Sequence, residues 1–387
     1  MSVERPLSLM LICGEPSGDQ LGAQLMTALK SIAGDRVTIT GVGGEAMAAQ
    51  GLKTLFPLDD TAVMGLHEVV PKIPAILARV RQAATFAAES KPDAVILIDS
   101  PDFTHRIARR LKRIAPRIAT INYVAPQVWA TRAYRARAMA RYFDLVLALL
   151  PFEAPFFEGY GLKAVFVGHP ALERGKRMVG GEAFRSRLGI APEAPLLAVL
   201  PGSRSNEIRF IYPEFREAAR LLVPTIPGLV CVIPTVPHVA GRVRAGAKDW
   251  PTPLHIVDGE ADKFAAFDAA DAALAASGTV TTELALARTP MVVAYKVGWL
   301  TAEIFRRLIR VKYATIVNLL LDREAVPEFI QQRCTPPALA GALVPLLNDK
   351  ARAAQQVADL EEAMCRLGEG AEQPSLRAAR AILDFLH

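Results

Sequence analysis

Short, continuously apolar segments of four to six residues alternate along this chain with longer segments of helical periodicity. Strands that are apolar at every position are typical of a parallel sheet covered by helices on both faces. The repeated order of strand and helix therefore predicts an α/β fold with doubly wound, Rossmann-like domains. The expected strands are Ser8–Cys13, Val37–Gly41, Ala94–Ile98, Ala119–Val124, Leu145–Leu149, Ala164–Val167, Leu196–Leu200, Leu229–Ile233, Leu254–Val257, Ala272–Ala275 and Met291–Ala294.

The alternation is interrupted once, at Gly168–Pro170, and the chain then stays charged and irregular from Glu173 to Arg187. This composition is typical of a linker between domains, and 387 residues are enough for two of them. We expect domains at residues 1–170 and 171–365 that face each other across a cleft. A final helix, at about residues 366–387, has no strand of its own and is expected to pack back on the first domain.

Charge is concentrated in one part of a chain whose net charge is +6. Between Phe103 and Phe143 there are ten Lys or Arg residues and no Asp or Glu. Such a segment attracts phosphates, anionic lipid or nucleic acid, or it is a solvated helix face. The basic residues are Arg106, Arg109, Arg110, Lys112, Arg113, Arg117, Arg132, Arg135, Arg137 and Arg141.

Cysteine and histidine spacing excludes several classes of site. The four cysteines form no C-x-x-C pair, which fits a reducing compartment without disulfides. The six histidines show no spacing typical of a zinc site. The apolar segment Leu7–Cys13 runs directly into a turn instead of a signal-peptide cleavage site, so we expect a cytoplasmic protein that at most touches a membrane surface.

The turn after the first expected strand is rich in glycine. Gly14, Gly18 and Gly22 are spaced G-x-x-x-G-x-x-x-G, which is neither the dinucleotide motif nor a P-loop. Glycines between a strand and a helix let a ligand approach the backbone, and a helix N-terminus favours anions. Glu15, Ser17 and Asp19 are candidate polar contacts in this turn. The alternative is a tight turn in which Ser17 or Asp19 caps the helix.

Asp99 follows the very apolar strand Ala94–Ile98. A carboxylate at the carboxyl end of a central strand points toward the expected cleft, where it can act as a general base. Asp99 and Asp102 are both possible caps of the next helix, and Asp102 is the better placed of the two.

Two turns of the second domain are suited to phosphate. In the first, Gly202 and Ser203 are expected to expose backbone N–H groups at a helix start, and Arg204 adds a planar, permanently charged guanidinium; the alternative is a loop with a surface Arg. In the second, Ser277, Gly278 and Thr279 begin a helix that carries Glu283 one turn later, where it can accept hydrogen bonds from sugar hydroxyls or merely complement the helix dipole.

Two further residues allow two interpretations each. Trp129 follows a strand and begins the basic segment, where it is a binding residue or a core aromatic. Asn318 stands alone in an apolar run, as a donor facing the cleft or as an internally satisfied structural amide.

Taken in order, these motifs resemble lipid-A-disaccharide synthases, which are glycosyltransferases of the GT-B architecture. The resemblance covers essentially the whole chain, with departures at Pro16, Val317 and Ser205–Asn206. Its segments are Gly14–Asp19, Leu21–Ala23, Ala62–Gly65, Ile98–Phe103, Tyr123–Trp129, Leu149–Glu153, Val167–His169, Leu200–Arg204, Ser277–Glu283 and Asn318–Leu320.

The resemblance implies transfer of 2,3-diacylglucosamine from a UDP-linked lipid donor to 2,3-diacylglucosamine 1-phosphate, with a β-1,6 bond formed and UDP released. It implies that Asp99 is the general base, that Arg204 and Ser277–Thr279 hold the diphosphate, that Glu283 holds the ribose and that Asn318 lines the cleft. The absence of an Asp-x-Asp motif fits a site without metal, and no other cofactor is expected.

The expected partners follow from these substrates. Both lipids are anionic, so we expect peripheral attachment to the cytoplasmic face of the inner membrane through the basic segment and the apolar-basic segment Pro57–Phe86. A homodimer is possible, and no nucleic-acid motif is present. The rival interpretations are another GT-B UDP-sugar enzyme, such as a UDP-N-acetylglucosamine 2-epimerase, and a basic surface-binding module.

Overall fold

The computed structural model describes residues 5–61, 66–131, 133–298 and 311–387. The chain divides into two compact units. The first unit contains residues 1–170 and 371–387, and the second contains residues 171–370. Each unit is built around one parallel sheet, which confirms the predicted α/β fold class.

The first unit has a six-stranded parallel sheet in the order β2-β1-β3-β4-β5-β6. Its strands are β1 (Leu7–Cys13), β2 (Val37–Val42), β3 (Ala94–Ile98), β4 (Ala119–Tyr123), β5 (Leu145–Ala148) and β6 (Ala164–Phe166). Its helices include α1 (Pro16–Ala33), α2 (Glu45–Ala49), α3 (Leu66–Ser90), α4 (Pro101–Ile114), α5 (Val128–Thr131), α6 (Tyr134–Met139), α7 (Glu153–Glu158) and α17 (Pro374–Leu386), with a short 3-10 helix at Leu58–Asp60.

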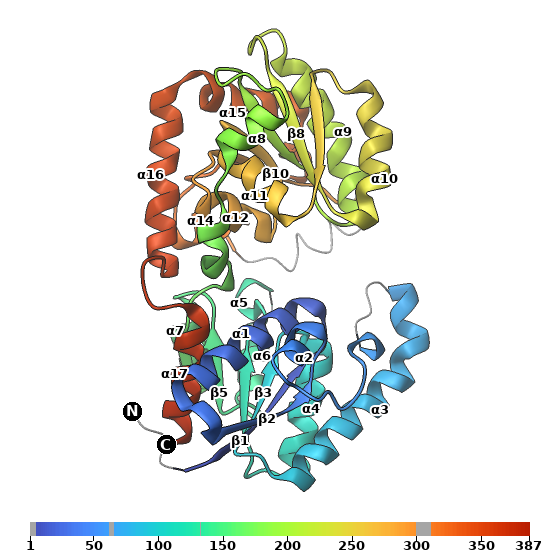
Figure 1. Cartoon of the computed structure of the whole chain (residues 1–387), viewed down its shortest axis with the longest axis vertical. Coiled ribbons are helices and arrows are strands. Elements are labelled where there is room, and N and C mark those ends of the chain that lie inside the picture. The colour runs from blue at the N-terminus through green and yellow to red at the C-terminus, as the bar shows by residue number, and fades with distance from the viewer. Residues whose placement is uncertain (1–4, 62–65, 132, 299–310) are drawn as a thin grey trace. The chain divides into compact units, whose positions relative to one another are not determined.

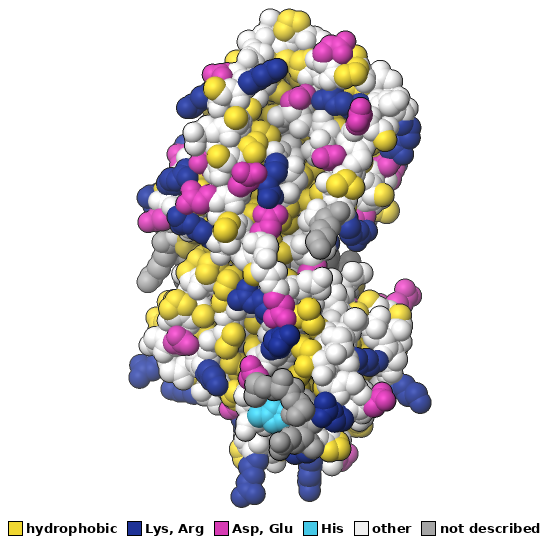
Figure 2. All heavy atoms as spheres, turned by 60° about the vertical axis from the view of Figure 1, so that its left-hand side comes forward, with side chains coloured by type: hydrophobic (Ala, Val, Ile, Leu, Met, Phe, Trp, Pro, Cys, Tyr) yellow, Lys and Arg dark blue, Asp and Glu magenta, His cyan; other side chains and the backbone are white. Residues whose placement is uncertain are grey.

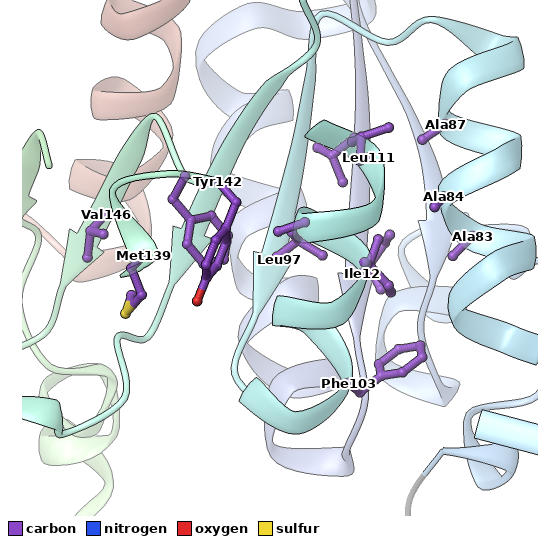
Figure 3. Packing of buried hydrophobic residues seen from close by; sticks show 14 of the residues in the cluster. Ile12, Ala83, Ala84, Ala87, Leu97, Phe103, Leu111, Met139, Tyr142 and Val146 are labelled. Carbon is purple, nitrogen blue, oxygen red and sulfur yellow. The ribbon is translucent and has the colours of Figure 1, made fainter. Parts of the chain in front are cut away.

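Helices cover both faces of this sheet because successive residues of each strand point to opposite sides. Leu9 and Leu11 of β1 pack in one core with α1 and α17, whereas Met10 and Ile12 pack in another core with α3, α4 and α6. Figure 3 shows the second core, where side chains of α3 and α4 meet those of β1 and β3. The continuous apolarity of the strands follows from burial on both faces.

The second unit repeats the design in the order β12-β11-β10-β7-β8-β9. Its strands are β7 (Leu196–Leu200), β8 (Val230–Thr235), β9 (Leu254–Asp258), β10 (Ala272–Ala276), β11 (Met291–Tyr295) and β12 (Glu328–Ile330). Its helices include α8 (Gly181–Arg187), α9 (Ser205–Leu222), α10 (Pro237–Gly246), α11 (Glu260–Ala269), α12 (Thr279–Leu286), α14 (Ile316–Leu321), α15 (Pro336–Asn348) and α16 (Lys350–Leu367), with a 3-10 helix at Pro170–Arg177.

The surface that each unit presents in Figure 2 is mixed in charge, with acidic and basic side chains interspersed with apolar ones. Among the described helices, none combines the length and apolarity that a bilayer crossing requires.

Candidate functional site

Asp99 lies on a strained turn between β3 and α4. Its φ is 52° and that of Ser100 is 45°, so two consecutive residues with side chains adopt the left-handed conformation. The turn is held by the Asp99 N–H, which donates to the Tyr123 carbonyl (2.9 Å), and by the Thr104 hydroxyl, which donates to the Asp99 carbonyl (2.7 Å). Backbone strain of this kind costs about 1–3 kcal/mol per residue and clusters at functional sites.

The glycine-rich turn after β1 reaches Asp99. The Ser17 hydroxyl donates to Asp99 Oδ2 at 3.4 Å, which is long for a hydroxyl hydrogen bond. Ser17 is exposed, Asp99 is half-buried, and Glu15 occupies the position before the first turn of α1. The structure therefore brings Ser17 of the first motif to the carboxylate of the second.

The other residues of that turn serve the fold. Asp19 is buried and its carboxylate accepts hydrogen bonds from the N–H groups of Gly44 (2.7 Å), Ala46 (2.9 Å) and Met47 (3.1 Å). A Cβ at Gly14 would lie 2.8 Å from the Cβ of Ser100, and one at Gly18 would lie 2.9 Å from that of Cys13. The Asp19 side chain, a candidate polar contact in the sequence, thus caps α2, and the two glycines allow close packing.

A pocket of about 360 Å³ lies beside the Asp99 turn. Its volume is within the ~300–1,000 Å³ range of small-molecule sites. Its apolar wall comes from three residues of α3, and its polar lining includes Glu15 and the start of α4. The lining residues are Glu15, Thr61, Ile73, Ile76, Leu77, Ser100, Pro101, Asp102, Phe103 and Arg106.

Trp129 is half-buried in α5, which follows β4. Its indole N–H donates to Oε1 of the buried Glu153 (3.0 Å), and its ring meets that of Phe152 edge-on, with centroids 4.9 Å apart. Burial raises the pKa of the Glu153 carboxyl, and its hydrogen bonds oppose that rise. Sequence reasoning missed Glu153, whose only signal was its place in the family segment Leu149–Glu153.

In the second unit, Arg204 is held by a residue that sequence reasoning also missed. Buried Glu207 accepts hydrogen bonds from the N–H groups of Ser203 and Arg204 (3.1 Å each) and from Arg204 Nη1 (3.0 Å). Gly202 has a φ of +102°, and a Cβ there would lie 2.3 Å from Glu207 Oε2. The Ser203 N–H, expected to be available to a phosphate, is therefore bound by Glu207, whereas the Arg204 side chain is 76% exposed.

The turn from Ser277 to Thr279 leads from β10 into α12. Gly278 and Thr279 are exposed, and Ser277 continues the sheet through a hydrogen bond from its N–H to the Ala294 carbonyl (2.9 Å). Because β7 and β10 are neighbours in a parallel sheet, this turn and the Arg204 turn lie at the same edge.

Glu283 of α12 is buried between two cations. Oε1 pairs with Arg174 (3.1 Å) and Oε2 with Lys263 of α11 (2.9 Å). Neither cation was a sequence candidate. The pairs satisfy the charge of Glu283, and each oxygen keeps a second lone pair with which it can accept a hydroxyl.

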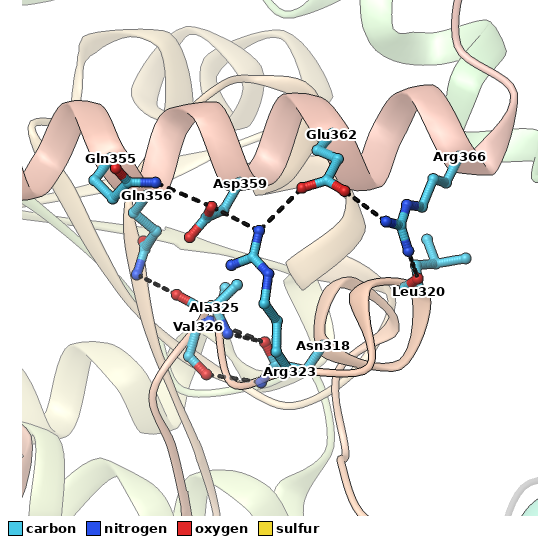
Figure 4. A network of polar contacts seen from close by, with 10 residues as sticks. All are labelled: Asn318, Leu320, Arg323, Ala325, Val326, Gln355, Gln356, Asp359, Glu362 and Arg366. Carbon is cyan, nitrogen blue, oxygen red and sulfur yellow. Dashed lines mark hydrogen bonds and ion pairs between the residues drawn. The ribbon is translucent and has the colours of Figure 1, made fainter.

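Asn318 has no exposed surface and all its polar positions are engaged. Its amide group donates to the Val326 carbonyl and to Glu328 Oε1 (2.7 Å each), and its oxygen accepts from the Ala325 and Val326 N–H groups (2.9 Å each; Figure 4). Of the two interpretations of Asn318, the burial and these hydrogen bonds favour the structural amide.

The described parts of the chain bring together no group of three or more His, Cys, Asp or Glu side chains that could hold a metal ion. The Ala62–Gly65 segment and Arg132, which the sequence singled out, lie outside the described residues.

Comparison with known proteins gives the family. The family model described as lipid-A-disaccharide synthetase matches residues 9–382. The lipid-A-disaccharide synthase of Rhodospirillum centenum is 48% identical over 382 residues, which cover 99% of this chain and 95% of the relative. That of Rhodopseudomonas palustris is 47% identical, with 98% and 96% covered. This chain belongs to the lipid-A-disaccharide synthase family. It is therefore a glycosyltransferase that forms the lipid A disaccharide.

Solved structures agree on the fold. The UDP-N-acetylglucosamine 2-epimerase of Neisseria meningitidis, solved with UDP-GlcNAc bound, has a TM-score of 0.63 at 12% identity, with 98% of this chain and 99% of that chain covered. MurG of Acinetobacter baumannii has a TM-score of 0.58 at 16% identity, with 98% and 99% covered. The family member described here thus has the GT-B fold class. Because the epimerases share the fold at low identity, they do not support the rival epimerase interpretation.

Proposed function

We propose that the enzyme transfers 2,3-diacylglucosamine from a UDP-linked donor to 2,3-diacylglucosamine 1-phosphate, with inversion at the anomeric carbon. The observation that carries the proposal is the family match over nearly the whole chain, together with Asp99 at the carboxyl end of β3. The products are the β-1,6-linked disaccharide 1-phosphate and UDP.

Asp99 is the general base of the proposed reaction. Its carboxylate takes the proton of the acceptor 6-hydroxyl while that oxygen forms a bond to the donor anomeric carbon. The bond from that carbon to the phosphate oxygen breaks, and its electron pair leaves with UDP. The strained turn supports this role because it presents the carboxylate at the sheet edge, where the side-chain contact that the described residues give it is the long one from Ser17.

The second unit holds the UDP part of the donor in this proposal. Arg204 and the start of α12 at Ser277–Thr279 are suited to the diphosphate, since an exposed guanidinium and a helix N-terminus both stabilise anions. Glu283 is suited to the ribose hydroxyls. Residues Asn318 and Glu207 act indirectly, by fixing the loops around these groups.

The pocket beside Asp99 receives the acceptor. Its polar wall borders the base, and its apolar wall of Ile73, Ile76 and Leu77 suits an acyl chain. Ile73 is 43% exposed, so the apolar wall continues onto the surface of α3. Side chains of residues 62–72, which include part of the predicted apolar-basic segment, lie outside those described.

We further propose that the first unit docks on the cytoplasmic face of the inner membrane through the basic segment and the apolar-basic segment Pro57–Phe86. Arg113, Arg117 and Arg137 of the basic segment are exposed, and basic residues near an anionic leaflet contribute about 1 kcal/mol each. Arg109, by contrast, lies over the Tyr142 ring at 4.8 Å and helps to hold the fold. We also propose that the enzyme forms a homodimer, which light scattering can test.

The decisive experiment is UDP release and product mass spectrometry after the two defined lipids are mixed. Asp99→Asn keeps the size of the side chain and removes its basicity, so turnover should fall by at least ~10²-fold with UDP affinity unchanged. Asp93→Asn, at the opposite end of β3, is the matched control and should keep normal turnover. An active Asp99→Asn enzyme would exclude Asp99 as the base, and wild-type enzyme that releases no UDP would overturn the proposed reaction.

A further inference from the structure

Glu153 is a buried carboxylate for which the proposed reaction has no use. It is 2% exposed and begins α7, just after β5. Oε1 accepts a hydrogen bond from the Trp129 indole N–H, and Oε2 accepts hydrogen bonds from the N–H groups of Leu149 and Leu150, all at 3.0 Å. Charge-assisted hydrogen bonds from three donors offset the cost of burying a carboxylate. Burying a carboxylate costs free energy, so the position of Glu153 calls for a functional reason.

The contacts of Glu153 determine how Trp129 can be used. The indole N–H is its only polar atom, and Glu153 engages it inside the protein. The ring of Phe152 meets the indole at an interplanar angle of 85°, which fixes the tilt of the ring. Trp129 remains half-buried, so a ligand can meet only its apolar ring and not its N–H group.

The position of this pair relates it to Asp99. Strand β4 lies between β3 and β5, with Ile98 opposite Tyr123 and Tyr123 opposite Leu147. The three strands are parallel, so Asp99, the segment leading to Trp129, and Glu153 all follow carboxyl ends at the same sheet edge. The Asp99 N–H donates to the Tyr123 carbonyl, which ties the first two of these turns together.

We propose that Glu153 is a positioning residue that holds the Trp129 indole as a rigid wall against the sugar ring of the acceptor. This inference rests on the proposed function, because it takes the acceptor to bind beside Asp99. Pyranose rings present a face of C–H groups, and an aromatic ring whose only polar group is already bound offers a matching apolar surface. A fixed wall orients the 6-hydroxyl toward Asp99, and loss of orientation slows the reaction.

The test replaces the carboxylate by its amide. In Glu153→Gln one amide position is an N–H donor, and it must face either the indole N–H or the N–H groups of Leu149 and Leu150. The indole then loses its fixed orientation, so kcat/KM for the acceptor should fall by about tenfold or more, with the donor KM unchanged within about twofold. In protein labelled with 5-fluorotryptophan, the fluorine resonance that Trp129→Phe removes should shift or broaden.

Asp144→Asn is the matched control. Asp144 Oδ2 accepts hydrogen bonds from the Thr120 N–H and from Lys112 Nζ, both at 2.7 Å, but Asp144 precedes β5 and so lies at the amino edge of the same sheet. This variant should lose stability without a change in the Trp129 resonance or in acceptor kcat/KM. Phe152→Leu removes the ring that contacts the indole edge-on, so it should also lower kcat/KM for the acceptor. This variant replaces Glu153→Gln in the test if Glu153→Gln does not fold.

The double variant of Glu153→Gln and Trp129→Phe completes the test. If Glu153 acts through Trp129, the double variant should be no slower than Trp129→Phe alone. Additive losses, or a normal acceptor kcat/KM in both Glu153→Gln and Phe152→Leu, would overturn the inference and leave the proposed function intact. Absence of UDP release from wild-type enzyme would overturn the proposed function, whereas the fluorine resonance would still report the contact between Glu153 and Trp129.

Discussion

Asn318→Ala separates a structural role from a substrate contact. The change removes two accepted and two donated hydrogen bonds, and it leaves the N–H groups of half-buried Ala325 and buried Val326 without the Asn318 oxygen. Each unsatisfied buried group costs about 1–3 kcal/mol, so the variant should lose about 3–5 kcal/mol of unfolding free energy. That is a large part of the stability of a typical domain.

The assay is denaturant unfolding followed by circular dichroism, with UDP affinity measured by calorimetry below the transition. Asn348→Ala is the control, because Asn348 is exposed and the contact described for its amide is a long one, 3.4 Å to the Thr225 carbonyl. The folded fraction of Asn318→Ala should bind UDP more weakly, since the loop is loosened. Full stability combined with lost turnover would refute the structural role and return Asn318 to the substrate site.

Three further results are expected. Arg204→Ala should weaken UDP binding by about 1.5–3 kcal/mol, whereas replacing the exposed Arg209 by Ala should leave UDP binding unchanged. Turnover should continue in EDTA. Equal weakening of UDP binding in both variants, or turnover that is lost in EDTA and restored by magnesium, would contradict the proposed donor site. Burial and the nearby Arg109 and Arg135 lower the pKa of His105 to about 4. The stabilising contribution of neutral His105 is therefore present above pH ~6.5 and is lost as pH falls toward 4, by about 2 kcal/mol between pH 7.5 and 5. If the unfolding free energies of wild type and His105→Gln changed equally with pH, this prediction would be contradicted. Binding to anionic vesicles should weaken as the salt concentration rises and when three exposed arginines of the first unit are replaced by Gln. The same replacement at three basic residues of the second unit should leave vesicle binding unchanged. Equal binding to neutral and anionic vesicles would show that the basic segment does not attract a membrane. The two sets are Arg113, Arg117 and Arg137, and Arg220, Lys350 and Arg352.

Local sequence predicted the sheets well because burial on both faces leaves a local signal. Ala94–Ile98 and Leu196–Leu200 are strands with the predicted bounds, whereas the final helix, expected at about residues 366–387, is α17 and begins only at Pro374. The strand predicted to end at Val124 ends at Tyr123, since Val124 has a φ of +70°. Such backbone reversals depend on tertiary packing more than on residue type.

The partners of buried carboxylates could not be predicted, because they come from distant parts of the chain. Asp19 was a candidate binding residue, but the N–H groups that it caps begin 25 residues later. Glu283 meets Arg174 from a segment expected to be a linker. By contrast, Glu207 contacts its own turn, and its spacing of three residues from Arg204 is a helix-start signal that sequence reasoning passed over.

The return of α17 to the first unit sets an order on biosynthesis. Ala378, Ala379 and Ile382 lie in the same core as Leu9 and Leu11, although the whole second unit separates them in the chain. On the ribosome, residues 7–170 emerge first, but α17, which completes their core, is synthesised only after residues 171–370. The second unit can fold while the first still exposes an apolar face of its sheet. Chaperone binding to nascent chains should therefore persist through synthesis of the second unit and end when α17 docks.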